Sequence, residues 1–177
     1  MHLFRADPVR LGDYIDSVNS QSLEKAKPRL QDLKNAFTEL TSPPAVISQI
    51  GQAVNAGRAI FLYGAPGNGK TSIAERVIRS VSEYIWIPRC ITVTEEIIRL
   101  YDPTVHEDVP LETKDEVLSS RKVDERWVRI KRPTVVTGGE LTMDMLECSH
   151  NPATGINEAP LQMKSNGGAL VIDDFGR

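Results

Sequence analysis

The chain has 177 residues, of which 40% are hydrophobic and 25% are charged, a composition typical of a globular protein with one main domain. Its formal net charge of −3 argues against a general nucleic-acid-binding surface, because such surfaces carry an excess of Lys and Arg. No apolar run approaches the roughly twenty residues of a membrane span, and the N-terminus lacks a secretory signal pattern. A cytoplasmic location is therefore the default expectation.

The N-terminal part, residues 1–41, is expected to be a helical or irregular lead-in to a main domain at 42–177. Residues 1–27 show no sustained hydrophobic period, so we expect them to be irregular or weakly helical. Pro28 suits the first turn of a helix. Its apolar face would comprise Leu30, Leu33, Phe37 and Leu40.

A second helix is marked at both ends. Ser42 is a suitable N-cap, Pro43 and Pro44 suit the first turn, and Gly57 follows the last turn. The apolar stripe of this helix would comprise Val46, Ile47, Ile50, Ala53 and Val54. The helix leads to a short apolar run at 59–63, which predicts a buried parallel strand.

Residues 64–71 match the phosphate-binding pattern G-x-x-x-x-G-K-[ST], and residues 72–78 continue with the apolar spacing of a helix. The glycines allow backbone N–H groups to point at phosphate oxygens, and the helix N-terminus adds partial positive charge. An ordinary Gly-rich turn would explain the glycines but not the adjacent Lys and Thr. The expected nucleotide-binding residues are Gly64, Ala65, Pro66, Gly67, Asn68, Gly69, Lys70, Thr71 and Ser72.

Strand character follows at 84–87, and the runs at 91–93 and 97–101 predict a hairpin that turns at 94–96. A short helix over 94–101 is the alternative. Residues 102–125 are rich in Asp, Glu, Pro and Lys and predict a solvated loop. Strands are expected again at 127–130 and 134–136, followed by a short helix beginning at Leu141 that stops before Asn151.

The cysteines do not indicate a metal centre. Cys90 and Cys148 have no near partner in the sequence, which predicts two reduced thiols rather than a disulfide or zinc framework. His150 lies two residues after Cys148, but two ligands are too few for a closed zinc site. We therefore expect His150 at the surface, in a turn.

The second half of the predicted site follows Gly167-Gly168, where a continuously apolar run at 169–172 ends in Asp173-Asp174. A buried parallel strand with acids at its carboxyl end is typical of the ligand-binding edge of an open α/β sheet. Lys70 would reach the β- and γ-phosphates, while the Thr71 hydroxyl and Asp173 would hold Mg²⁺. Asp174 would polarise the attacking water, so Lys70 and Asp174 are the catalytic candidates.

These two segments, at 61–71 and 167–177, resemble the Walker A and Walker B segments of AAA+ ATPases, most closely a bacterial group described as predicted AAA+ ATPases with chaperone activity, and more distantly MoxR-type ATPases. The resemblance covers about residues 42–177. It implies an α/β P-loop core with a parallel sheet flanked by helices. It also implies ATP and Mg²⁺ as cofactors, a homo-oligomeric ring such as a hexamer, and a protein substrate that ATP turnover remodels.

The chain departs from that family in two ways. AAA+ proteins usually carry Glu where this chain has Asp174, one methylene shorter, so the resemblance implies nucleotide binding more firmly than turnover. The chain also reaches Arg177 before the positions of the family's polar sensor, arginine finger and helical lid, which makes the core incomplete at its C-terminus. The long interval between Lys70 and Asp173 indicates an insertion that contains the hairpin and the loop at 102–125.

Two other functions remain open at the level of sequence. Many P-loop kinases for small molecules or nucleosides are close to this length. A nucleotide-gated interaction module with little turnover would fit Asp174 and the missing downstream elements. The tripeptide Asp174-Phe175-Gly176 also matches the magnesium motif of protein kinases, but the chain lacks the upstream His-Arg-Asp that those enzymes need.

Overall fold

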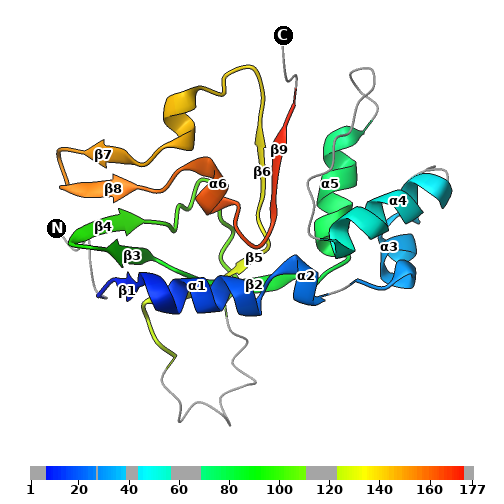
Figure 1. Cartoon of the computed structure of the whole chain (residues 1–177), viewed down its shortest axis with the longest axis horizontal. Helices are drawn as coiled ribbons and strands as arrows, with labels where there is room; N and C mark the ends of the chain where they lie inside the picture. Colours follow the sequence, from blue (N-terminus) through cyan, green and yellow to red (C-terminus); the bar gives the residue numbers. More distant parts are fainter. Residues whose placement is uncertain (1–6, 27, 39–43, 57–68, 111–122, 174–177) are drawn as a thin grey trace.

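The computed structural model describes residues 7–26, 28–38, 44–56, 69–110 and 123–173 (Figure 1). The described part is a mixed α/β structure. The helices are α1 (Leu11–Ser20), α2 (Leu23–Ala26), α3 (Leu30–Ala36), α4 (Pro44–Asn55), α5 (Lys70–Arg79), α6 (Leu161–Lys164) and the 3-10 helix η2 (Met143–Leu146). The strands are β1 (Val9–Arg10), β2 (Tyr84–Pro88), β3 (Cys90–Val93), β4 (Glu96–Arg99), β5 (Trp127–Lys131), β6 (Thr134–Thr137), β7 (Ser149–Asn151), β8 (Ile156–Glu158) and β9 (Ala169–Ile172).

The described strands form three sheets rather than the single parallel sheet that we expected. The largest has the order β1-β3-β4-β8-β7 and mixes parallel with antiparallel pairs. β2 pairs with β5 in an antiparallel ribbon, and β6 pairs with β9 in parallel. The expected strand at 59–63 lies outside the described residues.

The predicted hairpin is confirmed, and the alternative helix over 94–101 is wrong. β3 and β4 pair antiparallel with Ile91 opposite Ile98, and Thr94 takes a left-handed backbone (φ 58°) in the turn. Ile91 is fully buried and Ile98 nearly so, because β-branched side chains pack well on the pleated surface of a sheet. The strands expected at 84–87, 127–130, 134–136 and 169–172 are also present.

One hydrophobic cluster lies between α1 and the sheets. It contains Tyr14 of α1 together with buried residues of β2, β3, β4 and β5, namely Ile85, Ile87, Ile91, Ile98, Val128 and Ile130. Residues 7–26 therefore have more regular structure than the sequence indicated. α1 is a ten-residue helix in contact with β1, β2 and β3, and β1 is an edge strand of the largest sheet.

A second cluster joins the three helices on the right of Figure 1. Leu33 and Phe37 from the α3 segment pack with Ile50 and Val54 of α4 and with Val77 of α5. Leu33, Phe37, Ile50 and Val54 were predicted on the apolar faces of the helices after Pro28 and Ser42, and their burial confirms that periodicity. Leu40, Ser42 and Pro43 lie outside the described residues.

Three local expectations need correction. The helix beginning at Leu141 is only the 3-10 turn η2, whose Met143 and Met145 are exposed. The first part of the loop at 102–125 is not fully solvated, since His106 is buried and Asp108 bridges to Ile130. β9 is only half-buried, and Ile172 is 40% exposed.

None of the helices within the described ranges combines the length and apolar character that crossing a bilayer requires.

Candidate functional site

The C-terminal end of the predicted phosphate loop is described from Gly69 onward. Gly69 is the residue before α5 and has a left-handed backbone (φ 71°, ψ 22°), a conformation that favours glycine. Lys70, Thr71 and Ser72 form the first turn of α5, and all three are half-buried. The first turn closes through the Ile73 N–H, which donates to the Gly69 carbonyl at 2.9 Å. Residues 64–68 lie outside the described part of the chain.

Packing on both sides holds α5 in place. Its inner residues Val77 and Ile78 are buried, and the Arg76 guanidinium donates to the carbonyl of Ala36 at 2.8 Å. On the other side, α5 lies against β9 and β6. The helix that begins with Lys70 is thus a direct neighbour of the strand that ends at Asp173.

Asp173 lies at the carboxyl end of β9. β6 and β9 are parallel with Thr137 opposite Ile172, and the Asp173 N–H donates to the Thr137 carbonyl at 2.7 Å, which extends the pairing by one residue. In Figure 1 the carboxyl ends of β6 and β9 and the N-terminal end of α5 all lie at the top of the molecule. The structure therefore brings Lys70, Thr71 and Asp173 to the same end of the fold. Asp174 lies outside the described residues.

The start of β9 is held by close packing that depends on glycine. A Cβ atom at Gly168 would lie 1.9 Å from the carbonyl oxygen of Pro133, and the neighbouring Ala169 N–H donates to that same oxygen at 2.9 Å. Gly167, just before it, has a positive φ of 77°. The Gly-Gly pair is thus required by the approach of β9 to the segment that leads into β6.

Arg132 also supports this turn, although no local pattern in the sequence predicted it. Its buried guanidinium donates to the carbonyl oxygens of Gly167, Gln21 (2.9 Å) and Ser82 (2.7 Å) and to the Ser82 hydroxyl. Burial lowers the pKa of Arg132 from its usual value. This side chain ties the end of α1, the segment before β2 and the start of β9 together, across as many as 111 residues of sequence.

A further acid follows β6 at the same end as Asp173. The Glu140 carboxylate accepts the Gly138 N–H at 2.9 Å and the Thr137 hydroxyl at 3.4 Å. The Gly138 N–H lowers the pKa of Glu140, which favours the ionised form. Sequence reasoning missed Glu140, although an acid shortly after a strand and a Gly-Gly pair was visible as a signal.

The cysteine and histidine predictions hold in part. Both cysteines are free, and burial raises the pKa of the Cys90 thiol to about 11. His150 is exposed as expected, but it lies on β7 rather than in a turn, and its Nδ1 is 2.9 Å from the Asn157 side-chain oxygen. Across the described ranges, no group of three or more His, Cys, Asp or Glu side chains is arranged to hold a metal ion.

Comparisons with known proteins add no assignment. The sequence matches no model of a known protein family, and a search of curated proteins finds no match.

Proposed function

We propose that this chain binds ATP with Mg²⁺ at the N-terminal end of α5 and hydrolyses it, as an AAA+ type ATPase that remodels a protein partner. The observation that supports the proposal most directly is that the described parts of the two sequence segments, 69–71 and 167–173, include residues at the same end of the fold. α5, which begins with Lys70-Thr71 directly after Gly69, packs along β9, and Asp173 directly follows β9 on the same side.

The donor groups at this end fit a metal-bound polyphosphate. An ammonium group and a helix N-terminus carry positive charge for phosphate oxygens, while a hydroxyl and a carboxylate are the oxygen ligands that Mg²⁺ prefers. In the proposal, Lys70 binds the β- and γ-phosphates, and Thr71 with Asp173 holds the ion. Mg²⁺, when bound, neutralises charge on the phosphates.

Water activation is assigned to Asp174. Its carboxylate would accept a proton from, and orient, the water that attacks the terminal phosphorus. Because Asp174 is one methylene shorter than the usual Glu, a nucleotide-gated module with slow turnover is the second candidate function. Measuring ATP affinity and ATP turnover separately on the same preparation distinguishes the two. A ring of several copies and a protein substrate are further parts of the proposal that rest on the sequence resemblance.

The binding site is tested with Lys70→Ala. Loss of the ammonium group should weaken Mg²⁺-ATP binding at least tenfold, because a charged contact to the phosphates is removed. Arg79→Ala, which removes an exposed cation from the last turn of the same helix, is the matched control and should bind ATP normally. The measurement is titration with a fluorescent ATP analogue, and unchanged affinity in Lys70→Ala would refute the site.

A further inference from the structure

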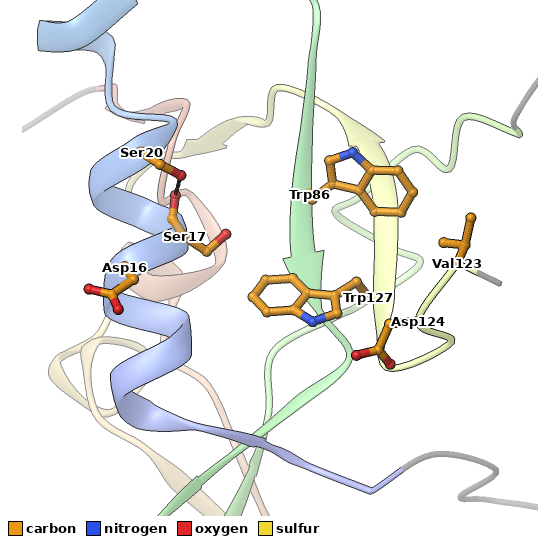
Figure 2. A pocket seen from close by; sticks show the side chains of 7 residues that line it. All are labelled: Asp16, Ser17, Ser20, Trp86, Val123, Asp124 and Trp127. Carbon is orange, nitrogen blue, oxygen red and sulfur yellow. Dashed lines mark hydrogen bonds between the residues drawn. The ribbon is translucent and has the colours of Figure 1, made fainter. Parts of the chain in front are cut away.

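A groove between α1 and the β2–β5 ribbon is lined by both tryptophans of the chain, Trp86 and Trp127. We call it the tryptophan groove. It is open to solvent, and its volume of about 540 Å³ lies within the range of about 300–1,000 Å³ that ligand sites occupy. Figure 2 shows the Trp127 indole directed toward α1. In Figure 1, α1, β2 and β5 lie at the bottom, away from the carboxyl ends of β6 and β9.

The pairing of β2 with β5 puts both indoles on the outer face of the ribbon. Trp86 is opposite Arg129, and Trp127 lies two residues before Arg129, so alternation places the two indoles on one side. The other side carries Ile85, Ile87, Val128 and Ile130, which are buried in the core. Both tryptophans are only half-buried, so part of each ring is left for a ligand.

The two indole N–H groups are hydrogen-bond donors that reach solvent. The contacts of Trp86 with Gln21 and of Trp127 with Asp124 use the backbone atoms of the tryptophans. Within the described ranges neither indole N–H has a hydrogen-bond partner, and Figure 2 draws none from either nitrogen. Every buried polar side-chain atom in those ranges does have a partner, so these two N–H groups are not sealed in the core.

α1 is fixed beside the indoles by the Gln21 side chain. The Trp86 backbone N–H donates to the Gln21 side-chain oxygen at 2.7 Å, and the Gln21 amide donates to the Trp86 carbonyl at 2.9 Å. The same amide donates to the Ser17 hydroxyl oxygen at 2.9 Å, and Figure 2 shows that hydroxyl on the side of α1 that faces the ribbon. The Ser17 O–H has no acceptor in the part of the chain that the structure describes, so it is a third donor at the groove.

The charged groups near the groove are engaged elsewhere. The Asp124 carboxylate accepts the Arg126 guanidinium at 2.7 Å, and the Asp16 carboxylate points away from both indoles in Figure 2. The described residues that line the groove include no Lys, Arg or His. Arg129, on the same face of the ribbon, is stacked over the Tyr84 ring, with its guanidinium carbon 4.4 Å from the ring centre. The groove therefore offers aromatic surface and N–H donors, with few acceptors and no lining cation.

We propose that the tryptophan groove binds a proline-rich segment of a partner protein in the polyproline II conformation. A proline ring packs against an indole face, and its carbonyl accepts a hydrogen bond, while its nitrogen carries no N–H that needs an acceptor. Consecutive prolines therefore match a surface that has donors and few acceptors. The polyproline II helix is formed before binding, so it loses little conformational entropy in an aromatic-lined groove. This proposal does not depend on nucleotide binding.

The chain itself does not supply such a segment within its 177 residues. Its 11 prolines include one adjacent pair, Pro43-Pro44, and Pro44 is the first residue of α4. These residues therefore offer a second copy no run of prolines to place in the groove. For this reason we assign the segment to a different protein.

Intrinsic fluorescence tests the proposal, because Trp86 and Trp127 are the only tryptophans in the sequence. The probe is a blocked hexaproline peptide, and the matched control is a blocked peptide of the same length with alternating glycine and serine. We expect hexaproline to change the tryptophan emission in a saturable way, and the control peptide to bind at least tenfold more weakly. Because no ion pair is formed, raising the salt concentration from about 0.05 M to about 0.5 M should change the affinity less than twofold.

Variants of the protein then assign the contacts. Trp127→Phe should weaken hexaproline binding about threefold to tenfold, because it removes one N–H donor and part of the aromatic surface, while Trp86 still reports. Trp86→Phe should have a similar effect, with Trp127 as the reporter. Tyr84→Phe, on the same face of the ribbon but outside the groove lining, is the matched control and should change the affinity less than twofold. Circular dichroism and the urea midpoint confirm that each variant is folded.

Three results would overturn the proposal. The first is equal binding of hexaproline and the glycine–serine peptide, and the second is unchanged affinity in both tryptophan variants. The third is the absence of any emission change at millimolar hexaproline. A strong loss of affinity at high salt would indicate a charged ligand, and cellohexaose binding more tightly than hexaproline would assign the groove to carbohydrate. Either outcome also contradicts a proline-rich partner.

Discussion

At Gly168 the absence of a side chain determines how closely β9 approaches the residue before β6. A Cβ atom there would lie 1.9 Å from the Pro133 carbonyl oxygen, which belongs to the backbone and cannot rotate away. Gly168→Ala should therefore destabilise the protein by about 2–4 kcal/mol.

The matched control is Gly139→Ala, since nothing lies within 4 Å of a Cβ at Gly139. Its free energy of unfolding should stay within about 0.5 kcal/mol of the wild type. Urea denaturation measures the free energy of unfolding of both variants. Equal stability of the two would show that the β6–β9 junction is not as tight as described.

His106 makes the stability depend on pH. Its Nδ1 accepts the Asp102 N–H at 3.0 Å, and its Nε2–H donates to the Lys164 carbonyl at 2.8 Å, so the neutral ring fits this site. Burial lowers the pKa of His106 below its usual 6.5, despite the nearby carboxylates of Asp102 and Asp108. Asp102 itself is paired with Lys164 at 2.6 Å, and its pKa is also lowered.

Because the unfolded chain takes up the His106 proton first as pH falls, this contribution to stability is complete above about pH 6.5 and is lost below it. Asp102 acts only at much lower pH, since its contribution is lost below about pH 4. His106→Gln keeps one acceptor and one donor but does not titrate, so its melting temperature should fall less than that of the wild type between pH 7 and pH 5. His150→Gln, at an exposed position, should follow the wild type. If the melting temperatures of the wild type and His106→Gln fell equally between pH 7 and pH 5, that result would contradict this role of His106.

At the scale of elements, α1 is part of the core rather than a lead-in. Tyr14 is 5% exposed within the first cluster, and its hydroxyl accepts the Asn166 side-chain N–H at 2.8 Å. Tyr14→Ala should cost about 3–5 kcal/mol, because it leaves a cavity and an unpaired amide. Ile15→Ala, at a neighbouring residue that is 47% exposed, should cost less than about 1 kcal/mol.

Chemical denaturation of the two α1 variants gives the comparison. A Tyr14→Ala protein as stable as Ile15→Ala would mean that α1 can detach without loss, in agreement with the irregular segment expected from the sequence. Leu11, Tyr14, Ile15 and Val18 do follow the spacing of one helix face, but the run is short, and only Tyr14 and Val18 reach the core while Leu11 and Ile15 are exposed.

Most strands and the helices α3 and α4 could be predicted, because their patterns are local. Short runs of β-branched residues indicated β3 and β4, and the apolar faces of α3 and α4 were recognisable from Leu33 to Val54. Four residues of the candidate site were predicted, namely Gly69, Lys70, Thr71 and Asp173. They lie at the end of the fold where α5 begins and β9 ends. Arg132 was not predicted, because a buried cation that donates to distant carbonyls has no local signature. Glu140 was missed although it stands shortly after a strand and a Gly-Gly pair.

At the scale of the whole molecule, ligand binding should stabilise the fold. The helix that begins with Lys70 contributes Val77 to the second cluster and packs on β9, so a ligand held there adds its binding energy to the folded state. With Mg²⁺-ATP at about a hundred times its dissociation constant, the gain is about 2.7 kcal/mol. For a chain of this size, the melting temperature should rise by roughly 5–10 °C.

Differential scanning fluorimetry measures this shift, with the Lys70→Ala protein as the comparison. That variant should show little or no rise at the same ATP concentration. An equal rise in both proteins would place the stabilising ATP elsewhere on the molecule.

The sequence by itself determined the types of most elements, the phosphate-binding pattern and the acids that follow β9, since each depends on residues within a few positions of one another. Only the tertiary structure decided that the described strands divide into three sheets and that the start of β9 is held by Arg132. It also placed both indoles beside α1. These features arise from contacts between residues far apart in the chain, such as Gln21 with Trp86 and Arg132 with Gln21, and local periodicity carries no information about such pairs.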